Sequence, residues 1–434
     1  FTMTPDPGYG IEDVRVDDQS VGTPASYTFE NIRANHSIHV SFKREVRVED
    51  VDIPNVTMKI GDVVKASLTV SDDLGLAYEL VSGSIGGYAL EDFVRISATS
   101  YEANFVIREG GTSYNASQDI PVSDLVISFE DIQSRAYNKP IVQGNDPIDA
   151  AYPEISSMRV EGGDKKIGEE VVLTILAEGR GYSADPQSTI NEIPLSAPNE
   201  SFSDEGNGNY RISYRIEDGD KDVVPPLSEL QVSLVLVKPS GNVGQPYSLV
   251  SNASELSIDA NAPVVLRMEV SSVEVGVGGI AKLTLTADGP GYTPGEETAI
   301  NGVPLSSPRL SFTELLGGLY EFSYTVAPED DPVAPGMLEA SVVLYDPAGN
   351  LGGPFLELGA NQLEIYTDLP LATFADPPEV CEGEEAQITV LLSGRPPWNF
   401  VLNDGTENTS FTGITSASYQ LSISPHQSST FYIT

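Results

Sequence analysis

The segment Ile190-Asn191-Glu192-Ile193-Pro194-Leu195-Ser196 returns 110 residues later as Ile300-Asn301-Gly302-Val303-Pro304-Leu305-Ser306. A fixed offset of this length is typical of tandem structural units. After about residue 220 the offset falls to 108, where Ser240-Gly241-Asn242 aligns with Ala348-Gly349-Asn350. The later copy is therefore predicted to have one loop that is two residues shorter.

A third, more divergent copy precedes these two. Met58-Lys59-Ile60-Gly61 resembles Lys165-Lys166-Ile167-Gly168, and Ile148-Asp149-Ala150 returns as Ile258-Asp259-Ala260. These alignments predict three complete modules, at 46–150, 151–260 and 261–369. Residues 1–45 and 370–434 do not follow the repeat, so we expect each to be part of a different β module.

The local pattern inside each copy is that of β-strands. Short segments rich in β-branched and aromatic residues are bounded by Gly, Pro, Asn and Asp, and no amphipathic helix is evident. The predicted strands are Val171–Leu176, Tyr210–Ile216, Leu230–Val237, Lys282–Thr286 and Leu338–Tyr345. Roughly seven short strands in about 105–110 residues predict an immunoglobulin-like sandwich. The expected fold class is all-β, a tandem array of such sandwiches.

The composition excludes several classes of partner. The chain has 64 acidic against 23 basic residues in 434, a net charge of −41. Nucleic-acid binding depends on basic side chains, so a nucleic-acid partner is not expected, and docking on anionic membranes is disfavoured. No apolar run is long enough for membrane insertion. One Cys and three His are too few soft ligands for zinc, haem or iron–sulfur sites.

The repeated region, roughly residues 46–370, resembles tandem bacterial Ig-like domains. The likeness rests on the turn Asp346-Pro347-Ala348-Gly349-Asn350 and the linker Ile258-Asp259-Ala260-Asn261-Ala262-Pro263. The Gly-x-Gly-Tyr and Ile-Asn-x-x-Pro-Leu segments are similar to repeats of very long bacterial surface proteins. The resemblance implies an extracellular location at the bacterial cell surface.

The two ends resemble other modules. Phe1–Phe42 looks like the second half of a divergent internalin-type B repeat, found chiefly in surface and secreted proteins. The last segment, with Val380-Cys381 and Gly394–Trp398, is similar to PKD-like or Ig-like repeats of large adhesins in gliding, type 9-secreting bacteria. In that family a second Cys commonly closes the module, so the resemblance implies that Cys381 is half of a disulfide.

Calcium is the one cofactor that the composition invites, because it takes six to eight oxygen ligands. Asp218, Asp220, Asp222 and Glu229 match positions 1, 3, 5 and 12 of a helix–loop–helix calcium loop, but Val223 stands where that loop needs Gly. A solvated acidic loop is the alternative. Calcium at the module joints is a second placement, with the recurring residues Asp149, Asp259 and Asp368 as ligands.

No catalytic constellation stands out from this background of carboxylates, so we expect no enzymatic activity. Tyr182 and Tyr292 can present aromatic faces to a sugar ring, and packing over a Gly-rich bend is the plainer interpretation. The turns at 239–242 and 347–350 are predicted to be hairpin turns.

The sequence therefore predicts a non-catalytic stalk segment of a very large bacterial cell-surface or secreted adhesin, spacing a distal binding region from the cell. Its expected partners are the neighbouring domains of the same chain, with surface glycans or other cells at a distance. A glycan-binding or accessory region of a secreted polysaccharide-degrading enzyme is the first alternative. A subunit of an extracellular polymer is the second.

Overall fold

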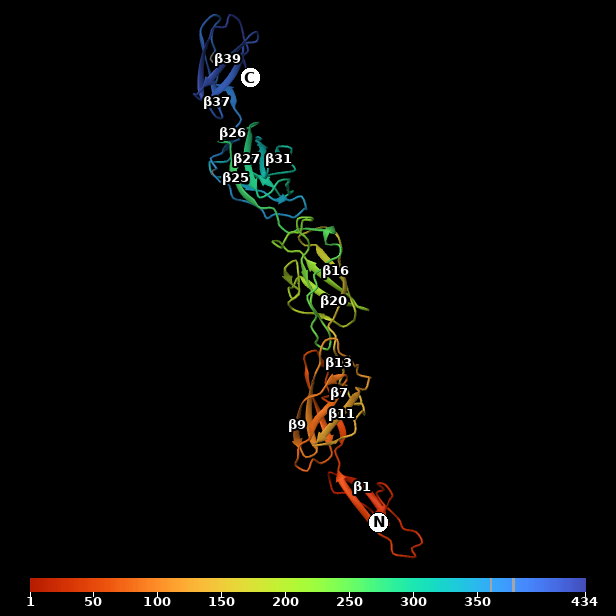
Figure 1. The fold of residues 1–434 in the computed structure, drawn as a ribbon. Coiled ribbons are helices and arrows are strands. Elements are labelled where there is room, and N and C mark those ends of the chain that lie inside the picture. The colour runs from red at the N-terminus through yellow and green to blue at the C-terminus, as the bar shows by residue number, and fades with distance from the viewer. Residues whose placement is uncertain (360, 377–378) are drawn as a thin grey trace. The chain divides into compact units, whose positions relative to one another are not determined.

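The computed structural model describes residues 1–359, 361–376 and 379–434, and it consists almost wholly of short β-strands (Figure 1). These ranges hold no α-helix and one short 3-10 turn, Ala253–Glu255. The chain falls into two compact units. The first contains residues 1–162, 170–214 and 225–256, and the second contains 163–169, 215–224 and 257–434.

The first unit begins with a three-stranded sheet at the N-terminus. Its strand order is β2-β1-β3, with bounds Gln19–Ser20, Tyr9–Val16 and Ile38–Arg44. Val14 and Val16 are buried on one face of β1, which is the alternation expected of a half-buried strand.

Residues 46–150 form two four-stranded sheets with the strand order of an immunoglobulin sandwich. One sheet has the order β4-β6-β10-β9, with bounds Val48–Asp52, Val63–Val70, Ser100–Val106 and Glu91–Ser97. The other has the order β12-β11-β7-β8, with bounds Ile132–Gln133, Val122–Phe129, Glu79–Ile85 and Tyr88–Ala89. In immunoglobulin letters these sheets are A-B-E-D and G-F-C-C′. β5 (Met58–Lys59) pairs in parallel with β13 (Ile148–Asp149).

The A-B-E-D order returns in the remainder of the first unit as β14-β16-β21-β20, with bounds Ile155–Val160, Glu170–Ala177, Asn209–Arg215 and Glu200–Gly206. The opposing strands are shorter: β17 (Ser183–Ala184) with β23 (Leu236–Val237), and β19-β18-β22 (Ile193–Pro194, Thr189–Ile190 and Val232–Ser233). The predicted continuous strand Leu230–Val237 is thus wrong. It is broken because β22 pairs with β18 and β23 pairs with β17.

The second unit repeats this plan. Its A-B-E-D sheet is β25-β27-β32-β31, with bounds Val265–Val270, Ile280–Ala287, Leu319–Thr325 and Leu310–Leu316. Opposite it are β28–β34 (Thr293–Pro294, Leu344–Tyr345) and β30-β29-β33 (Val303–Pro304, Ala299–Ile300, Ala340–Ser341). The predicted strand Leu338–Tyr345 is broken for the same reason as its counterpart. β26 (Glu274–Gly276) and β35 (Glu364–Tyr366) pair in parallel.

The second unit also contains β15 (Gly163–Lys166), which pairs with β24 (Leu256–Asp259). Its last part has two three-stranded sheets. They are β36-β37-β40 (Leu371–Phe374, Ala386–Ser393, Ser418–Ile423) and β39-β38-β41 (Asn408–Ile414, Trp398–Asn403, Tyr432–Ile433). Trp398, Phe400 and Val390 are buried between these sheets.

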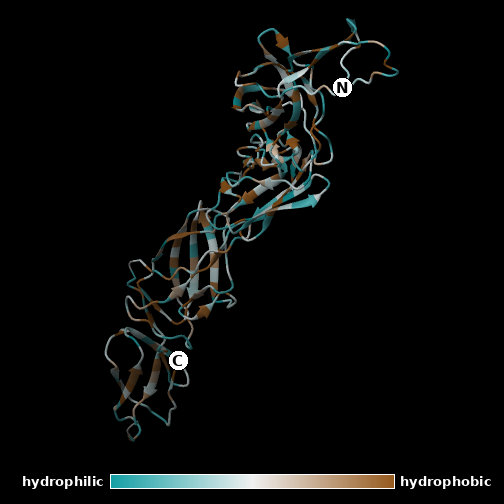
Figure 2. Ribbon diagram, turned by 90° about the horizontal axis from the view of Figure 1, so that it is seen from below, coloured by the Kyte–Doolittle hydropathy of each residue, from teal (hydrophilic) through white to brown (hydrophobic). Residues whose placement is uncertain are grey.

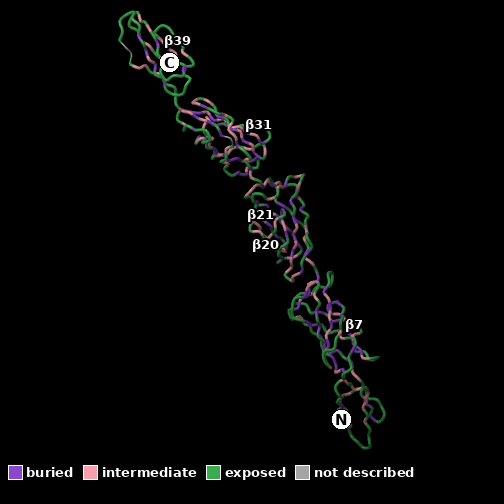
Figure 3. The backbone as a smooth tube through the Cα atoms, turned by 90° about the vertical axis from the view of Figure 1, so that its left-hand side faces the viewer, coloured by how far each residue is buried: buried purple, intermediate pink, exposed green. Residues whose placement is uncertain are grey.

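A stacked tyrosine marks the E strand of all three repeated modules. Tyr101, Tyr210 and Tyr320 are fully buried, and the hydroxyl of each accepts a backbone N–H from Tyr78, Tyr182 and Tyr292 in turn. Hydrophobic and hydrophilic residues alternate along strands of the ribbon (Figure 2), and buried and exposed residues alternate along the backbone (Figure 3). The all-β class with tandem Ig-like sandwiches is confirmed. The module boundaries stay a prediction.

Candidate functional site

The contact between residues 46–150 and the residues that follow is built from two turns of the first unit. We call it the first joint. Lys59 Nζ donates to the carbonyl of Gly241 at 3.3 Å, and the N–H of Ile60 donates to Asn242 Oδ1 at 3.0 Å. Lys59 ends β5, whereas Gly241 and Asn242 form the Pro-Ser-Gly-Asn turn after β23. This turn therefore docks on the preceding module as well as reversing the chain.

Asn242 is the centre of the first joint. Its side-chain amide nitrogen donates to the carbonyls of Asp149 and Ala151 at 2.9 and 3.1 Å. Together with the bond from Ile60, these contacts engage both ends of a carboxamide that is only 2% exposed. Burying an amide is costly unless it is hydrogen-bonded, so this pattern fixes the linker against both turns.

The second unit contains the same contact, which we call the second joint. Lys166 Nζ donates to the carbonyl of Gly349 at 3.0 Å, and the N–H of Ile167 donates to Asn350 Oδ1 at 2.9 Å. Asn350 Nδ2 donates to the carbonyl of Asp259 at 3.0 Å. Each residue stands at the repeat position of its counterpart in the first joint. The contact is therefore a property of the repeat.

The glycine of each docking turn is required by its backbone. Gly241 and Gly349 have φ values of 87° and 88°, in the region that favours glycine. A Cβ on Gly349 would lie 3.0 Å from Lys166 Nζ. Glycine thus allows both the turn and the close approach of the lysine.

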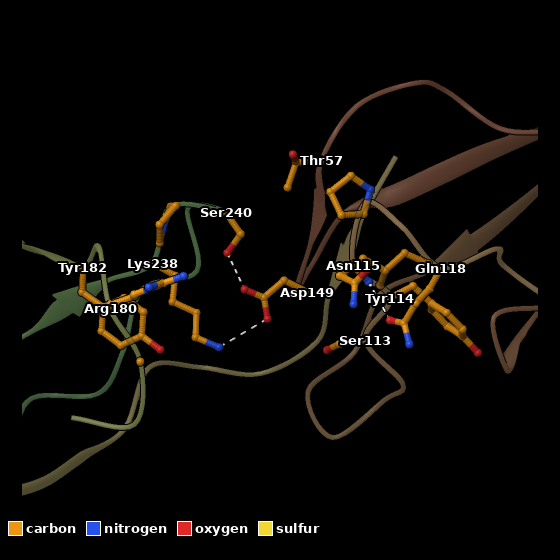
Figure 4. A pocket seen from close by; sticks show the side chains of 14 residues that line it. Thr57, Ser113, Tyr114, Asn115, Gln118, Asp149, Arg180, Tyr182, Lys238 and Ser240 are labelled. Atoms are coloured by element: carbon orange, nitrogen blue, oxygen red, sulfur yellow. Dashed lines mark hydrogen bonds and ion pairs between the residues drawn. The ribbon is translucent and has the colours of Figure 1, made fainter. Parts of the chain in front are cut away.

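The two joints differ in charge. In the first joint Lys238 Nζ lies 3.3 Å from Asp149, and Ser240 Oγ donates to Asp149 at 2.6 Å (Figure 4). Lys238 Nζ also lies 3.5 Å from Glu178. In the second joint the positions of Asp149, Glu178 and Lys238 are all aspartates, namely Asp259, Asp288 and Asp346. An ammonium is therefore replaced by a carboxylate.

The amide of Asn350 holds two of these carboxylates together. Its Nδ2 lies 2.9 Å from Asp346 Oδ2 and 3.3 Å from Asp259 Oδ1. Burial raises the pKa of Asp259, and the carboxylates of Asp346 and Asp222 raise it further. Like charges in a partly buried site disfavour ionisation in this way.

Arginine side chains make the contacts between the repeated modules and the two end segments. Within the first unit, the Arg44 guanidinium lies 3.6 Å from the centre of the Phe129 ring and donates to the carbonyl of Asp73. Stacking a guanidinium on an aromatic ring is a favourable cation–π contact. The N-terminal segment is thus attached to the sandwich by a side chain that differs from those of the two repeated joints.

Arg395 makes the corresponding contact for the last segment, within the second unit. It pairs with Glu274 at 3.1 Å and Glu364 at 3.0 Å, and lies over the ring of Tyr366. Gly276-Val277 stands where the other modules have Lys-Ile. The Tyr366 ring packs so closely on Gly276 that a side chain would not fit there.

Two of the four predicted calcium-loop residues contact the linker of the second joint. Asp218 accepts the N–H of Ala262 at 3.0 Å, and Asp222 accepts the N–H of Ala260 at 2.8 Å. Asp220 accepts the N–H of Glu217, whereas Glu229 is exposed. The structure brings Asp222 close to Asp259 but leaves Asp368 exposed elsewhere.

No group of three or more His, Cys, Asp or Glu side chains is arranged to hold a metal ion within the described ranges. Calcium at Asp149, Asp259, Asp368 or the acidic loop stays a prediction. Cys381 is exposed and is a free thiol in the structure, and its predicted pairing also stays a prediction.

An open groove of about 580 Å³ lies beside the first joint, lined by Tyr114, Gln118, Arg180 and Lys238 among others (Figure 4). Tyr182 reaches it only marginally, because its side chain is 8% exposed and its ring stacks on Tyr210. A Cβ on Gly179 would clash with the Tyr182 hydroxyl. Tyr182 therefore packs over the Gly-rich bend, which was the plainer of its two interpretations.

The hydrogen-bonded contacts of the joints were not predicted, although the sequence contains a pattern that accompanies them. Lys-Ile and Gly-Asn both recur in register, and the copy that has Gly276-Val277 lacks the first pair. The turns that make each joint lie 182 or 183 residues apart. A local pattern does not show that two such turns meet.

No family model matches the chain, and no curated protein matches it. Several solved tandem structures are similar to it. The I9–I11 tandem of titin is 9% identical, covering 73% of this chain and 98% of its own, with a TM-score of 0.27. The Escherichia coli adhesin FdeC is 16% identical, with the same coverages and TM-score. A 1.5-MDa bacterial ice-binding adhesin is 14% identical, covering 74% and 99%, with a TM-score of 0.25.

The strand order within each module defines the class of protein: a tandem array of immunoglobulin-like β-sandwiches. Across the described ranges, no helix is long and apolar enough to cross a membrane.

Proposed function

We propose that this chain is a non-catalytic stalk segment of a very large bacterial cell-surface or secreted adhesin, and that it spaces a distal binding region from the cell. The recurrence of one hydrogen-bonded contact, Lys to Gly and Ile to Asn, at two successive joints carries this proposal. A hydrogen-bonded joint limits the angles between successive modules more than a flexible linker does, and this helps to maintain a spacing.

The charge of the chain supports the same function. A net charge of −41 keeps neighbouring copies apart and soluble. Four of the 23 basic side chains, Arg44, Lys59, Lys166 and Arg395, make contacts where modules meet. Acidic surfaces outside the joints then prevent modules from packing against one another side by side.

Glycan binding, the first alternative, loses its main support. Tyr182 is buried in a stack and Tyr292 repeats that stack against Tyr320. This packing leaves the Tyr182 ring almost no surface for a sugar, and it holds the half-exposed Tyr292 ring against its own loop.

Small-angle scattering tests the stalk proposal. We expect the full chain to give an elongated particle, and we expect deletion of residues 151–260 to shorten its maximum dimension by about one third of the length of the three-module region. Compact scattering from the full chain would contradict the stalk.

A further inference from the structure

We propose that the second joint is an electrostatically loosened hinge, and that the first joint is locked by Lys238. The two joints share their hydrogen-bond framework, so the difference between them is one of charge. The charge difference lies in the joints themselves, so it does not depend on which binding region the array carries.

Lys238 neutralises the first joint by lying between two acidic side chains. Its ammonium is within 3.5 Å of both Asp149 and Glu178, and its side chain is only 11% exposed. Asp149 belongs to the linker, whereas Glu178 and Lys238 belong to the next module. The lysine therefore ties the linker to that module by charge as well as by shape.

Asp346 takes the position of Lys238 in the second joint. Its Oδ1 accepts the N–H groups of Gly349 and Asn350 at 2.7 and 2.8 Å, and its Oδ2 accepts Asn350 Nδ2. These bonds fix the carboxylate in the docking turn, where it is 7% exposed. Asp346 cannot turn away from the linker without breaking its own turn.

The linker of the second joint presents further negative charge to Asp346. Asp259 shares the Asn350 amide with it, and Asp222 accepts the N–H of Ala260 beside Asp259. In the first joint the N–H of Ala150 is accepted by the neutral hydroxyl of Ser113. Asp288 completes the set, because its Oδ1 accepts the N–H of Val264 and the Tyr292 hydroxyl.

Lys166 Nζ bonds a carbonyl in this joint, as Lys59 Nζ does in the first joint. It therefore balances charge equally in both joints and does not offset the change from Lys238 to Asp346. Repulsion between the docking turn and the linker is then specific to the second joint.

Hydrogen exchange measures the opening of each joint through one amide proton. The N–H of Ile60 bonds Asn242 in the first joint, and the N–H of Ile167 bonds Asn350 in the second. Exchange is recorded on the full chain in buffer containing EDTA, so that no divalent cation contributes. We expect Ile167 to exchange roughly tenfold faster than Ile60 after correction for intrinsic rates.

Reciprocal variants separate charge from shape. Asp346→Lys should slow exchange at Ile167 by roughly tenfold and leave Ile60 unchanged, and Lys238→Asp should speed exchange at Ile60 by a similar factor. Asp346→Asn keeps an oxygen acceptor for the turn and should give an intermediate rate at Ile167. Each joint serves as the internal control for the other.

The inference is overturned if Ile167 is as well protected as Ile60, or if Asp346→Lys and Asp346→Asn both leave its exchange unchanged. Lys238→Asp provides an independent test, should Asp346→Lys fail to fold. An unchanged rate at Ile60 in that variant also contradicts the proposal.

Discussion

The side-chain oxygen of Asn242 accepts the backbone N–H of Ile60 at 3.0 Å, across 182 residues of sequence. Asn350 and Ile167 repeat this bond at 2.9 Å, across 183 residues. A single carboxamide thus joins a turn of one module to the linker and the following module. As in the interiors of the sandwiches, the buried polar groups of the joints are hydrogen-bonded.

Asn242→Ala should open the linker of the first joint. It leaves the N–H of Ile60 and the carbonyls of Asp149 and Ala151 without their partner, at a cost of about 1–3 kcal/mol. We expect elastase to cleave after Ala151 roughly tenfold faster than in the parent chain. Asn209→Ala, at an exposed position, is the control and should leave cleavage unchanged.

Gly349→Ala should destabilise the module that carries the second docking turn. The φ of 88° is strained for alanine by about 1 kcal/mol, and the new methyl group would crowd Lys166 Nζ. Calorimetry should show that one unfolding transition moves down by several degrees. Gly353→Ala is the matched control, because no atom lies within 4 Å of its added Cβ and its φ is ordinary. Equal shifts in both variants would exclude a special role for Gly349.

The stability of residues 46–150 should fall at acidic pH because Asp73 becomes protonated. Arg95 and the Tyr101 hydroxyl, which bond the fully buried Asp73 carboxylate, lower its pKa to about 2. A depressed folded pKa stabilises the fold above the unfolded value near 3.8. About 2 kcal/mol should be lost as the pH falls from about 4 to 2.

Denaturant unfolding at several pH values measures this loss. Asp73→Asn should unfold more easily than the parent chain at neutral pH, and its stability should change less between about pH 4 and 2. The same acid dependence in the variant and the parent would show that other carboxylates govern it.

Calcium gives a separate test of the predicted acidic ligands. If Asp218, Asp220 and Asp222 bind calcium, EDTA should lower the melting temperature of the chain, and excess calcium should restore it. Asp222→Asn should remove the response. Melting that is indifferent to chelator would show that Asp218 and Asp222 act only as acceptors for the linker N–H groups of Ala262 and Ala260.

Much of the fold follows from repetition and alternation alone. The offset of 110 residues predicts like modules, and the alternation at Tyr210 and Tyr214 correctly predicts one buried face of a strand. Leu230–Val237 shows where local pattern fails. It is uniformly strand-like, but its two halves pair with different strands, and partner choice depends on distant residues.

The joints depend on the same kind of distant information. The turn at Gly241-Asn242 was predicted from its residue types, which suit a left-handed backbone. That Asn242 also binds a module ending some ninety residues earlier depends on the packing of whole sandwiches. Co-recurrence of Lys-Ile with Gly-Asn is the one sequence signal that could have indicated it.

Single-molecule force spectroscopy on the full chain reports whether the repeated modules are independent folding units, because each unit that resists force separately gives its own unfolding event. We expect separate unfolding events for the three repeated modules, each releasing about 35 nm of chain, as follows for roughly 105–110 residues at 3.3–3.6 Å per residue. One cooperative rupture that releases the whole repeated region at once would contradict this expectation.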